Sequence, residues 1–324
     1  MFRRRKIMLI IGIDGGGTKT DAVLCDEYGR VLRRAKGGPS SATSLVPKKA
    51  AENIQETLKV LLKDYQGLDT QIDSLFAGLS GGGVGNNPEI MHGYLEEMMT
   101  NCTVLRNYND AVNALRSVIP HGDAVSVISG TGSSVFACVD DRMQQIGGWG
   151  YLLGDEGSGF DLGRRALMSA LKEIDGRGHK TSLTQACAEK LGMPVNQAIP
   201  ALYNGGRMMI ADFSRVLCAE AEKGDPVALQ QFTEAVKELA YAIRTGGERI
   251  PAAHKPVATA GSIWNCDMYK KMMQEELGAD YELRSTDLPP VYGSFVIALS
   301  NLGLRVTEEI EKNFRETLCE PEAV

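Results

Sequence analysis

The chain has 324 residues, of which 43% are hydrophobic and 23% carry a charge, which is typical of a soluble globular protein. This length exceeds what one compact core usually supports and predicts two domains. The net charge of −6 argues against a nucleic-acid partner, which requires a basic surface. No segment reaches the roughly 20 apolar residues of a membrane span, so no membrane association is expected.

The first residues, "MFRRRKIMLIIGID", combine a basic head with an apolar run, as an export signal does. The run ends at Asp14 without a small-residue cleavage site, so export is not expected. The 7 cysteines are scattered and include no C-x-x-C pair. This pattern predicts reduced thiols in the cytoplasm, and it offers no metal-ligand spacing.

The first part of the chain alternates apolar β-type runs with helical patterns. Strands are predicted at residues 6–13, 20–25, 31–36 and 104–108, and in the segment "IDSLFAGLSGGG". The turn "DEYGR" joins the second and third strands as a hairpin. Helices are predicted at residues 47–64, where Ile54, Leu58, Leu61 and Leu62 share one face, and at residues 110–118.

Residues 124–148 repeat this opening in outline: strand, glycine loop, strand, turn and strand. Two copies of one unit predict two similar α/β halves. The chain then becomes mostly helical up to residue 249, and "KPVATAGSIW" predicts a last strand before three helices. The predicted domains are residues 1–120 and 121–324. The second carries a helical insertion at about residues 160–250, and the last helix is allowed to return to the first domain.

Each half contains a glycine-rich loop between two strands. The first loop holds Gly15, Gly16, Gly17, Thr18 and Lys19, and the second holds Gly130, Thr131, Gly132 and Ser133. A P-loop requires lysine where Thr18 stands, and a dinucleotide-binding loop requires glycine where Val135 stands. Exposed amides of such loops form anion-binding nests. One loop is equally well an ordinary tight turn, but two matching loops favour phosphate binding.

Six motifs appear in this order: "GIDGGGTKTDAVL", "AGLSGGG", "YNDAVNAL", "VISGTGSSV", "GGWGYLLGDEGSG" and "ATAGSIW". With them the chain resembles the sugar kinase–Hsp70–actin superfamily. Within it the chain is similar to the N-acetylglucosamine kinases and the related BadF/BadG/BcrA/BcrD ATPase group. The resemblance implies two ribonuclease-H-like (actin-like ATPase) domains with a ligand cleft between them. It also implies an ATP- and Mg²⁺-dependent kinase of an amino sugar.

The resemblance assigns roles to two aspartates. Asp110 would be the general base that accepts the proton of a sugar hydroxyl, whereas the plain alternative is a helix N-cap. Asp14, at the end of the first strand, would hold Mg²⁺, whereas the plain alternative is a turn cap.

The remaining expected contacts also follow from the resemblance. The nucleotide would be held by the two glycine loops, with adenosine at Ala211, Gly261 and Ser262. The sugar would meet Ser41, Asn109, Asp110, Gly148, Trp149, Gly150 and Asp155. The plain alternative makes Trp149 a core anchor and Asp155 the cap of the following helix.

Ser41 stands where the family has an asparagine that helps to bind the sugar. A hydroxyl cannot offer both an amide donor and an amide acceptor. N-acetylglucosamine, glucosamine and N-acetylmuramate therefore all stay open as substrates.

The sequence leaves two other functions open. One is an ATPase that activates a partner enzyme through cluster-binding cysteines at a dimer interface, and the other is a non-catalytic sugar sensor. A homodimer is expected by analogy only.

Overall fold

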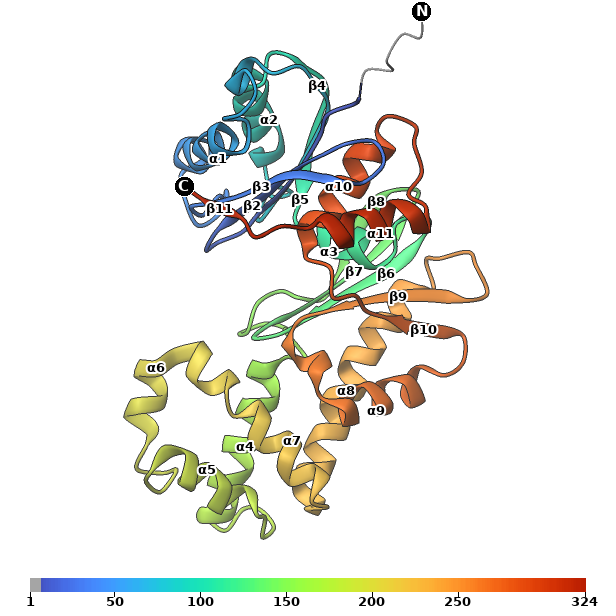
Figure 1. Ribbon diagram of the computed structural model, residues 1–324. Helices are drawn as coiled ribbons and strands as arrows, with labels where there is room; N and C mark the ends of the chain where they lie inside the picture. The colour runs from blue at the N-terminus through green and yellow to red at the C-terminus, as the bar shows by residue number, and fades with distance from the viewer. Residues whose placement is uncertain (1–6) are drawn as a thin grey trace, which may run out of the picture. The chain divides into compact units, whose positions relative to one another are not determined.

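The computed structural model describes residues 7–324, which form two compact units (Figure 1). The first unit contains the chain up to His121 together with Thr286–Val324, and the second contains Gly122–Ser285. The sequence pattern predicts a second domain of residues 121–324, from which only the last helix returns to the first domain. That assignment is wrong for residues 286–324, because the chain returns at Thr286 with two helices and a terminal strand.

The first unit is built on a six-stranded sheet in the order β11-β3-β2-β1-β4-β5. Strands β1, β2 and β3 are antiparallel, whereas β4 and β5 run parallel to β1. The predicted start of the first strand, Lys6, lies outside the described residues. The strands are β1 (Ile10–Gly15), β2 (Thr20–Cys25), β3 (Val31–Gly37), β4 (Ile72–Leu79), β5 (Cys102–Asn109) and β11 (Glu322–Ala323).

The second unit has a five-stranded sheet with the equivalent order β8-β7-β6-β9-β10. Its first three strands are again antiparallel, and β9 and β10 run parallel to β6. The predicted internal repeat is therefore confirmed, as is the α/β fold class. The strands are β6 (Ala124–Ser129), β7 (Ser133–Val139), β8 (Arg142–Ile146), β9 (Lys255–Ala260) and β10 (Tyr281–Arg284).

Helices cover both faces of the first sheet. The predicted apolar face of α1 is buried at Ile54, Leu58 and Leu61, which pack in the core with the side chains of β1, β2 and β4. The pattern analysis missed α2, whose buried side chains are only Met91 and Leu95. The helices are α1 (Pro47–Leu61), α2 (Asn87–Met98), α3 (Ala111–Val118), α10 (Pro290–Ser300) and α11 (Glu308–Thr317), with a short 3₁₀ turn at Gly67–Asp69.

Helix α10 packs unusually close to β1 and α3. A Cβ atom added to Gly12 of β1 would lie 2.6 Å from the backbone nitrogen of Phe295. One added to Gly293 of α10 would lie 1.9 Å from the carbonyl oxygen of Asn113 on α3. The hydroxyl of Ser294 donates to the carbonyl oxygen of Ile13 at 2.9 Å. Helix α10, from the C-terminal part of the chain, therefore packs directly against both β1 and α3.

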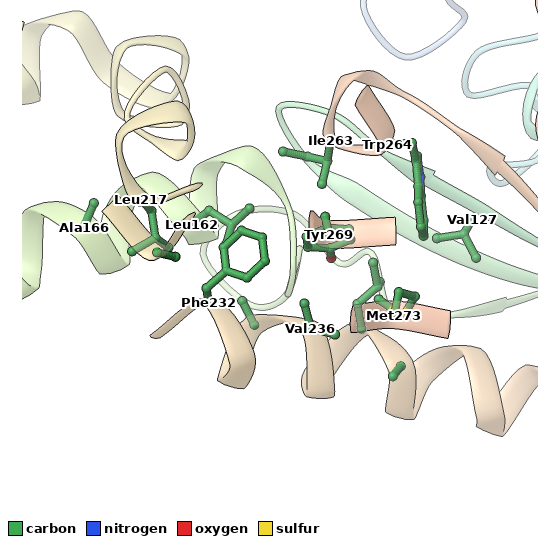
Figure 2. Packing of buried hydrophobic residues seen from close by; sticks show 14 of the residues in the cluster. Val127, Leu162, Ala166, Leu217, Phe232, Val236, Ile263, Trp264, Tyr269 and Met273 are labelled. Atoms are coloured by element: carbon green, nitrogen blue, oxygen red, sulfur yellow. The ribbon is translucent and has the colours of Figure 1, made fainter. Parts of the chain in front are cut away.

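The core of the second unit lies between its sheet and its helices (Figure 2). Tyr269 packs edge-on against Phe232 and Trp264, with ring centroids 5.7 and 5.5 Å apart. Its hydroxyl donates to the carbonyl oxygen of Gly157 at 2.9 Å, so the core anchors the loop before α4.

The helices of the second unit are α4 (Gly159–Ile174), α5 (Leu183–Leu191), α6 (Ile199–Ala211), α7 (Ser214–Glu222), α8 (Pro226–Gly247) and α9 (Asp267–Leu277), with a 3₁₀ turn, η2, at Ser262–Asn265. Within residues 7–324, every helix is too short or too polar to cross a bilayer.

Candidate functional site

In the first unit, the candidate residues gather where parallel strands β1, β4 and β5 end at one sheet edge. The amide of Ser80 after β4 donates to the carbonyl oxygen of Gly15 at 2.7 Å. The amide of Asp110 after β5 donates to the carbonyl oxygen of Leu79 at 3.2 Å. These backbone bonds bring Asp14 and Asp110 to the same edge, the place where open α/β sheets bind ligands.

Asp14 is partly buried and receives a hydrogen bond from α3. The side-chain amide of Asn113 donates to Asp14 Oδ1 at 2.7 Å. Burial raises the pKa of Asp14 to about 6, and the nearby negative charges of Asp110 and Asp21 add to this rise. A turn cap would bond to the backbone of its own turn, whereas Asp14 Oδ1 accepts from the side chain of Asn113 in a distant segment. A buried carboxylate among other acids fits a cation such as Mg²⁺, which binds through one or two carboxylates and water.

Asp110 stands at the N-cap position of α3, but its side chain makes no capping hydrogen bond. Instead, Asn109 Oδ1 accepts from the amide of Ala111 at 2.9 Å. Burial raises the pKa of Asp110, against the opposing effect of hydrogen bonds that include one from the Ser80 hydroxyl. Asp110 therefore occupies the N-cap position of α3 without a capping hydrogen bond from its side chain.

The first glycine loop is exposed at Gly17, Thr18 and Lys19. Its base is fixed by a bond from the amide of Gly16 to the carbonyl oxygen of Lys19 at 2.9 Å. Ser41 differs, since only 1% of its surface is exposed. Its hydroxyl accepts from the amide of Ser44 at 3.3 Å and is 3.2 Å from the hydroxyl of Thr43. The Ser41 hydroxyl therefore makes its hydrogen bonds within the turn formed by residues 41–44.

In the second unit, the glycine loop rests on the start of α4. The amide of Gly159 donates to the carbonyl oxygen of Gly130 at 2.7 Å, and that of Phe160 to Thr131 at 3.1 Å. The hydroxyl of Ser133 is buried and donates to the carbonyl oxygen of Glu156 at 2.8 Å. Gly130 and Thr131 remain partly accessible. Ser133 therefore fixes the loop through its side chain, and only the rest of the loop offers an open surface.

The other expected nucleotide residues lie around the same loop. Gly261 has φ +104°, and an added Cβ atom would lie 2.2 Å from the carbonyl oxygen of Ser129. A Cβ atom on Gly130 would lie 3.7 Å from the nitrogen of Ser262, and one on Gly159 would lie 3.5 Å from the carbonyl oxygen of Ala211. The fold of the second unit thus brings together segments from β6, α6 and η2.

A pocket of about 320 Å³ joins this loop to the "GGWG" motif. It is lined by Ile128, Gly132, Ser133, Ser134, Gly148, Gly150, Asp155 and Arg207. Trp149 is 64% exposed, so the core-anchor alternative is wrong. The helix after the motif, α4, is capped by Ser158, whose hydroxyl accepts from the amide of Asp161 at 3.2 Å, so Asp155 is not its cap.

Asp155 is 97% buried, with φ +61°, and its carboxylate is already paired. Its Oδ1 accepts from the amide of Gly150 at 3.2 Å, and its Oδ2 accepts from Arg207 Nη2 at 2.7 Å. The guanidinium of Arg207 also lies over the ring of Tyr151, 5.6 Å from its centroid. The sequence analysis missed Arg207. Its one local signal is Gly206, whose non-helical backbone interrupts α6 just before it.

A second pocket, of about 300 Å³, lies beside η2 and α7. Its lining is Leu162, Ser214, Arg215, Cys218, Ala219, Glu222, Phe232, Ser262, Ile263, Asn265, Cys266 and Tyr269. This second pocket includes Ser262 in its lining. It combines apolar walls with a few polar groups, as pockets for small molecules do.

The two sheets of equal topology, each with a glycine loop after its first strand, define the class of two-domain actin-like ATPases. The chain belongs to the BadF/BadG/BcrA/BcrD ATPase family, whose model matches residues 11–294.

Relatives span nearly the whole chain. The N-acetylmuramic acid/N-acetylglucosamine kinase of Clostridium acetobutylicum is 32% identical over 265 residues, which are 79% of this chain and 85% of that protein. The N-acetyl-D-glucosamine kinase of Dictyostelium discoideum is 27% identical over 314 residues, 90% of this chain and 98% of that protein. The crystal structure of a putative N-acetylglucosamine kinase from Chromobacterium violaceum has a TM-score of 0.66 and 26% identity, and covers 90% of this chain and 99% of its own.

Proposed function

We propose that the protein is an ATP-dependent kinase that phosphorylates a hydroxyl of an amino sugar, N-acetylglucosamine or a close relative. The observation that carries this proposal is the position of the Asp110 side chain. Its carboxylate lies beside Asp14 at the sheet edge and takes no part in capping α3. The relatives that match most of the chain are named as kinases of N-acetylglucosamine and N-acetylmuramic acid, which supports the same reaction.

In the proposed reaction, the carboxylate of Asp110 accepts the proton of the sugar hydroxyl. The hydroxyl oxygen then bonds to the γ-phosphorus of ATP, and the bond from this phosphorus to the β-phosphate oxygen breaks to release ADP. Phosphoryl transfer depends mainly on positioning and charge stabilisation, so the general base contributes only part of the rate enhancement. The raised pKa of Asp110 favours this role, because a stronger base takes the proton more readily.

Asp14 is the residue that would hold Mg²⁺ beside the phosphates, directly or through water. When bound, this ion supplies positive charge that neutralises the transferring phosphoryl group. The bond from Asn113 fixes Asp14 Oδ1 and so orients the carboxylate.

ATP would bind through the two glycine loops and the residues around η2. The exposed Gly17, Thr18 and Lys19 offer amides, a hydroxyl and a positive charge to phosphate. Adenosine would lie against Gly261 and Ser262, in the pocket of about 300 Å³.

The sugar would contact the "GGWG" motif and Asp155 in the second unit, and Asn109 and Asp110 in the first. Arg207 pairs with Asp155 and so holds its carboxylate in one orientation. Asn109 Oδ1 already accepts from the amide of Ala111, so its side-chain NH₂ group is the part left for the sugar. Ser41 is buried within its own turn, which makes it the weakest of the proposed sugar contacts.

The test is an assay of ADP release with ATP, Mg²⁺ and a panel of N-acetylglucosamine, N-acetylmuramate, glucosamine and glucose. We expect ADP release that depends on an amino sugar, together with a phosphorylated sugar identified by mass spectrometry. ATP hydrolysis at the same rate with every sugar and without sugar would contradict the proposal and favour an ATPase that acts on a partner. Sugar binding with no ATP turnover would favour a sensor.

A further inference from the structure

Two of the scattered cysteines meet in the pocket beside η2. Cys218 lies on α7, and Cys266 stands between η2 and α9 at the N-cap position of α9. Glu222 follows Cys218 by one helical turn on α7 and shares its face. The two sulfur atoms and a Glu222 carboxylate oxygen all lie within 4.8 Å of one another. Sequence spacing gave no sign of this cluster.

The first turn of α9 begins directly after Cys266, which stands at its N-cap position. The backbone amides of Met268 and Tyr269, in the first turn of α9, point at its sulfur atom. The thiol of Cys218 donates to Glu222 Oε1 at 3.7 Å, so these two side chains of α7 are already in contact.

We infer that Cys218, Glu222 and Cys266 form a binding site for a soft divalent cation such as Zn²⁺. Two thiolates and a carboxylate are ligands that Zn²⁺ takes in tetrahedral sites, and the cation displaces the thiol protons to solvent when it binds. Zinc–sulfur bonds of about 2.3 Å place two sulfur ligands about 3.8 Å apart, so shifts of about 1 Å suffice from the present positions. The three side chains line an open pocket, which leaves room for water as the fourth ligand.

Occupation of this site has a consequence that rests on the proposed function. The same pocket is lined by Ser262, where adenosine is proposed to bind. A cation held by Cys218 and Cys266 would occupy part of the space for the base. Nucleotide binding and cation binding would then exclude one another.

The direct test is a titration of the reduced, metal-free full chain with Co²⁺, followed by displacement with Zn²⁺. We expect one equivalent of Co²⁺ to give thiolate charge-transfer and tetrahedral ligand-field absorption, which Zn²⁺ removes. Cys218→Ser and Cys266→Ser should each weaken binding at least 100-fold, and Glu222→Gln about 10-fold. Cys319→Ser, an exposed cysteine outside the cluster, is the matched control and should bind as the wild type does.

A second measurement covers the case in which a serine variant fails to fold. The unmodified protein is treated with an alkylating reagent, and the labelled cysteines are identified by mass spectrometry. Zn²⁺ should protect Cys218 and Cys266 and leave Cys319 reactive. An absent absorption band, a band that persists in both serine variants, or equal labelling with and without Zn²⁺ would overturn the site.

The competition is tested separately with a fluorescent ATP analogue. Saturating Zn²⁺ should lower the affinity of the wild type for the analogue at least 10-fold. In Cys218→Ser, the affinities measured with and without Zn²⁺ should be equal to each other. Unchanged affinity in the wild type would overturn the competition, although the cation site would stand on the Co²⁺ spectrum. Loss of the proposed kinase activity would likewise leave that spectrum unaffected.

Discussion

At the residue scale, the fold places the carboxylates of Asp14 and Asp110 near each other at one edge of the sheet, where both are partly buried. The charged form of each carboxylate would be more stable in water, so burial raises the pKa of both. Such an arrangement is common at functional sites, because a bound cation or a transferred proton relieves the repulsion. The first two predictions concern these residues.

Asp110→Asn should lower kcat by about 10²–10⁴, the usual contribution of a general base. The amide keeps the shape of the side chain and cannot take the proton. Because Asp110 does not cap α3, the midpoint of urea unfolding should stay close to that of the wild type. The measurement is steady-state kinetics with the best sugar, alongside urea unfolding. Full activity in this variant would show that another group is the base.

Asp14→Asn should change stability in a pH-dependent way when Mg²⁺ is absent. The pKa is about 6 in the folded chain and 3.8 in the unfolded chain, so the folded state binds the proton more tightly. This favours folding below pH 4, and the benefit disappears as the pH rises through 6. Above pH 6 the variant should therefore be more stable than the wild type by up to about 3 kcal/mol, although it loses activity.

Urea unfolding in EDTA at pH 4 and pH 8 measures this difference. Asn113 still has an oxygen acceptor at residue 14 in the variant, so its hydrogen bond is preserved. A variant that is less stable than the wild type at pH 8 would mean that the Asp14 carboxylate stabilises the fold.

At the scale of elements, the position of Asp14 depends on how closely α10 approaches β1 and α3. Glycines at Gly12 and Gly293 permit that approach, and Ser294 ties α10 to the strand. The stretch from residue 290 reads as an ordinary apolar helix, so its sequence pattern does not reveal which sheet it covers.

Gly293→Ala should destabilise the first unit by about 1–3 kcal/mol, because its methyl group would collide with the carbonyl oxygen of Asn113. Gly93→Ala is the matched control, since Gly93 lies inside α2 and has no atom within 4 Å of an added Cβ. The control should raise stability by about 0.5–1 kcal/mol through helix propensity. Thermal unfolding of both variants measures this, and equal effects would contradict the close packing.

At the scale of the whole molecule, the two units differ in how the chain builds them. The second unit is one continuous segment with its own core, whereas the first unit needs the C-terminal return. This difference predicts different behaviour of fragments.

A fragment of residues 122–285 should fold by itself and unfold cooperatively, because its core lies entirely within it. A fragment of residues 1–121 should not, because without α10 the face of β1 around Gly12 loses its cover. Circular dichroism and urea unfolding of both fragments test this. Cooperative folding of residues 1–121 would contradict the structural role assigned to α10, and addition of residues 286–324 should restore folding.

The sequence by itself determined the strands of both hairpins, the glycine loops, the internal repeat and the α/β class. These depend on local periodicity and on turn residues, which act over a few neighbouring positions. It also indicated Asp14 and Asp110, through the resemblance of their motifs to those of the sugar kinases. Only the tertiary structure decided that α10 belongs to the first unit, that Arg207 pairs with Asp155, and that Cys218 meets Cys266. These contacts join side chains from distant segments, and the packing of helices against sheets sets them without leaving a local pattern in the chain.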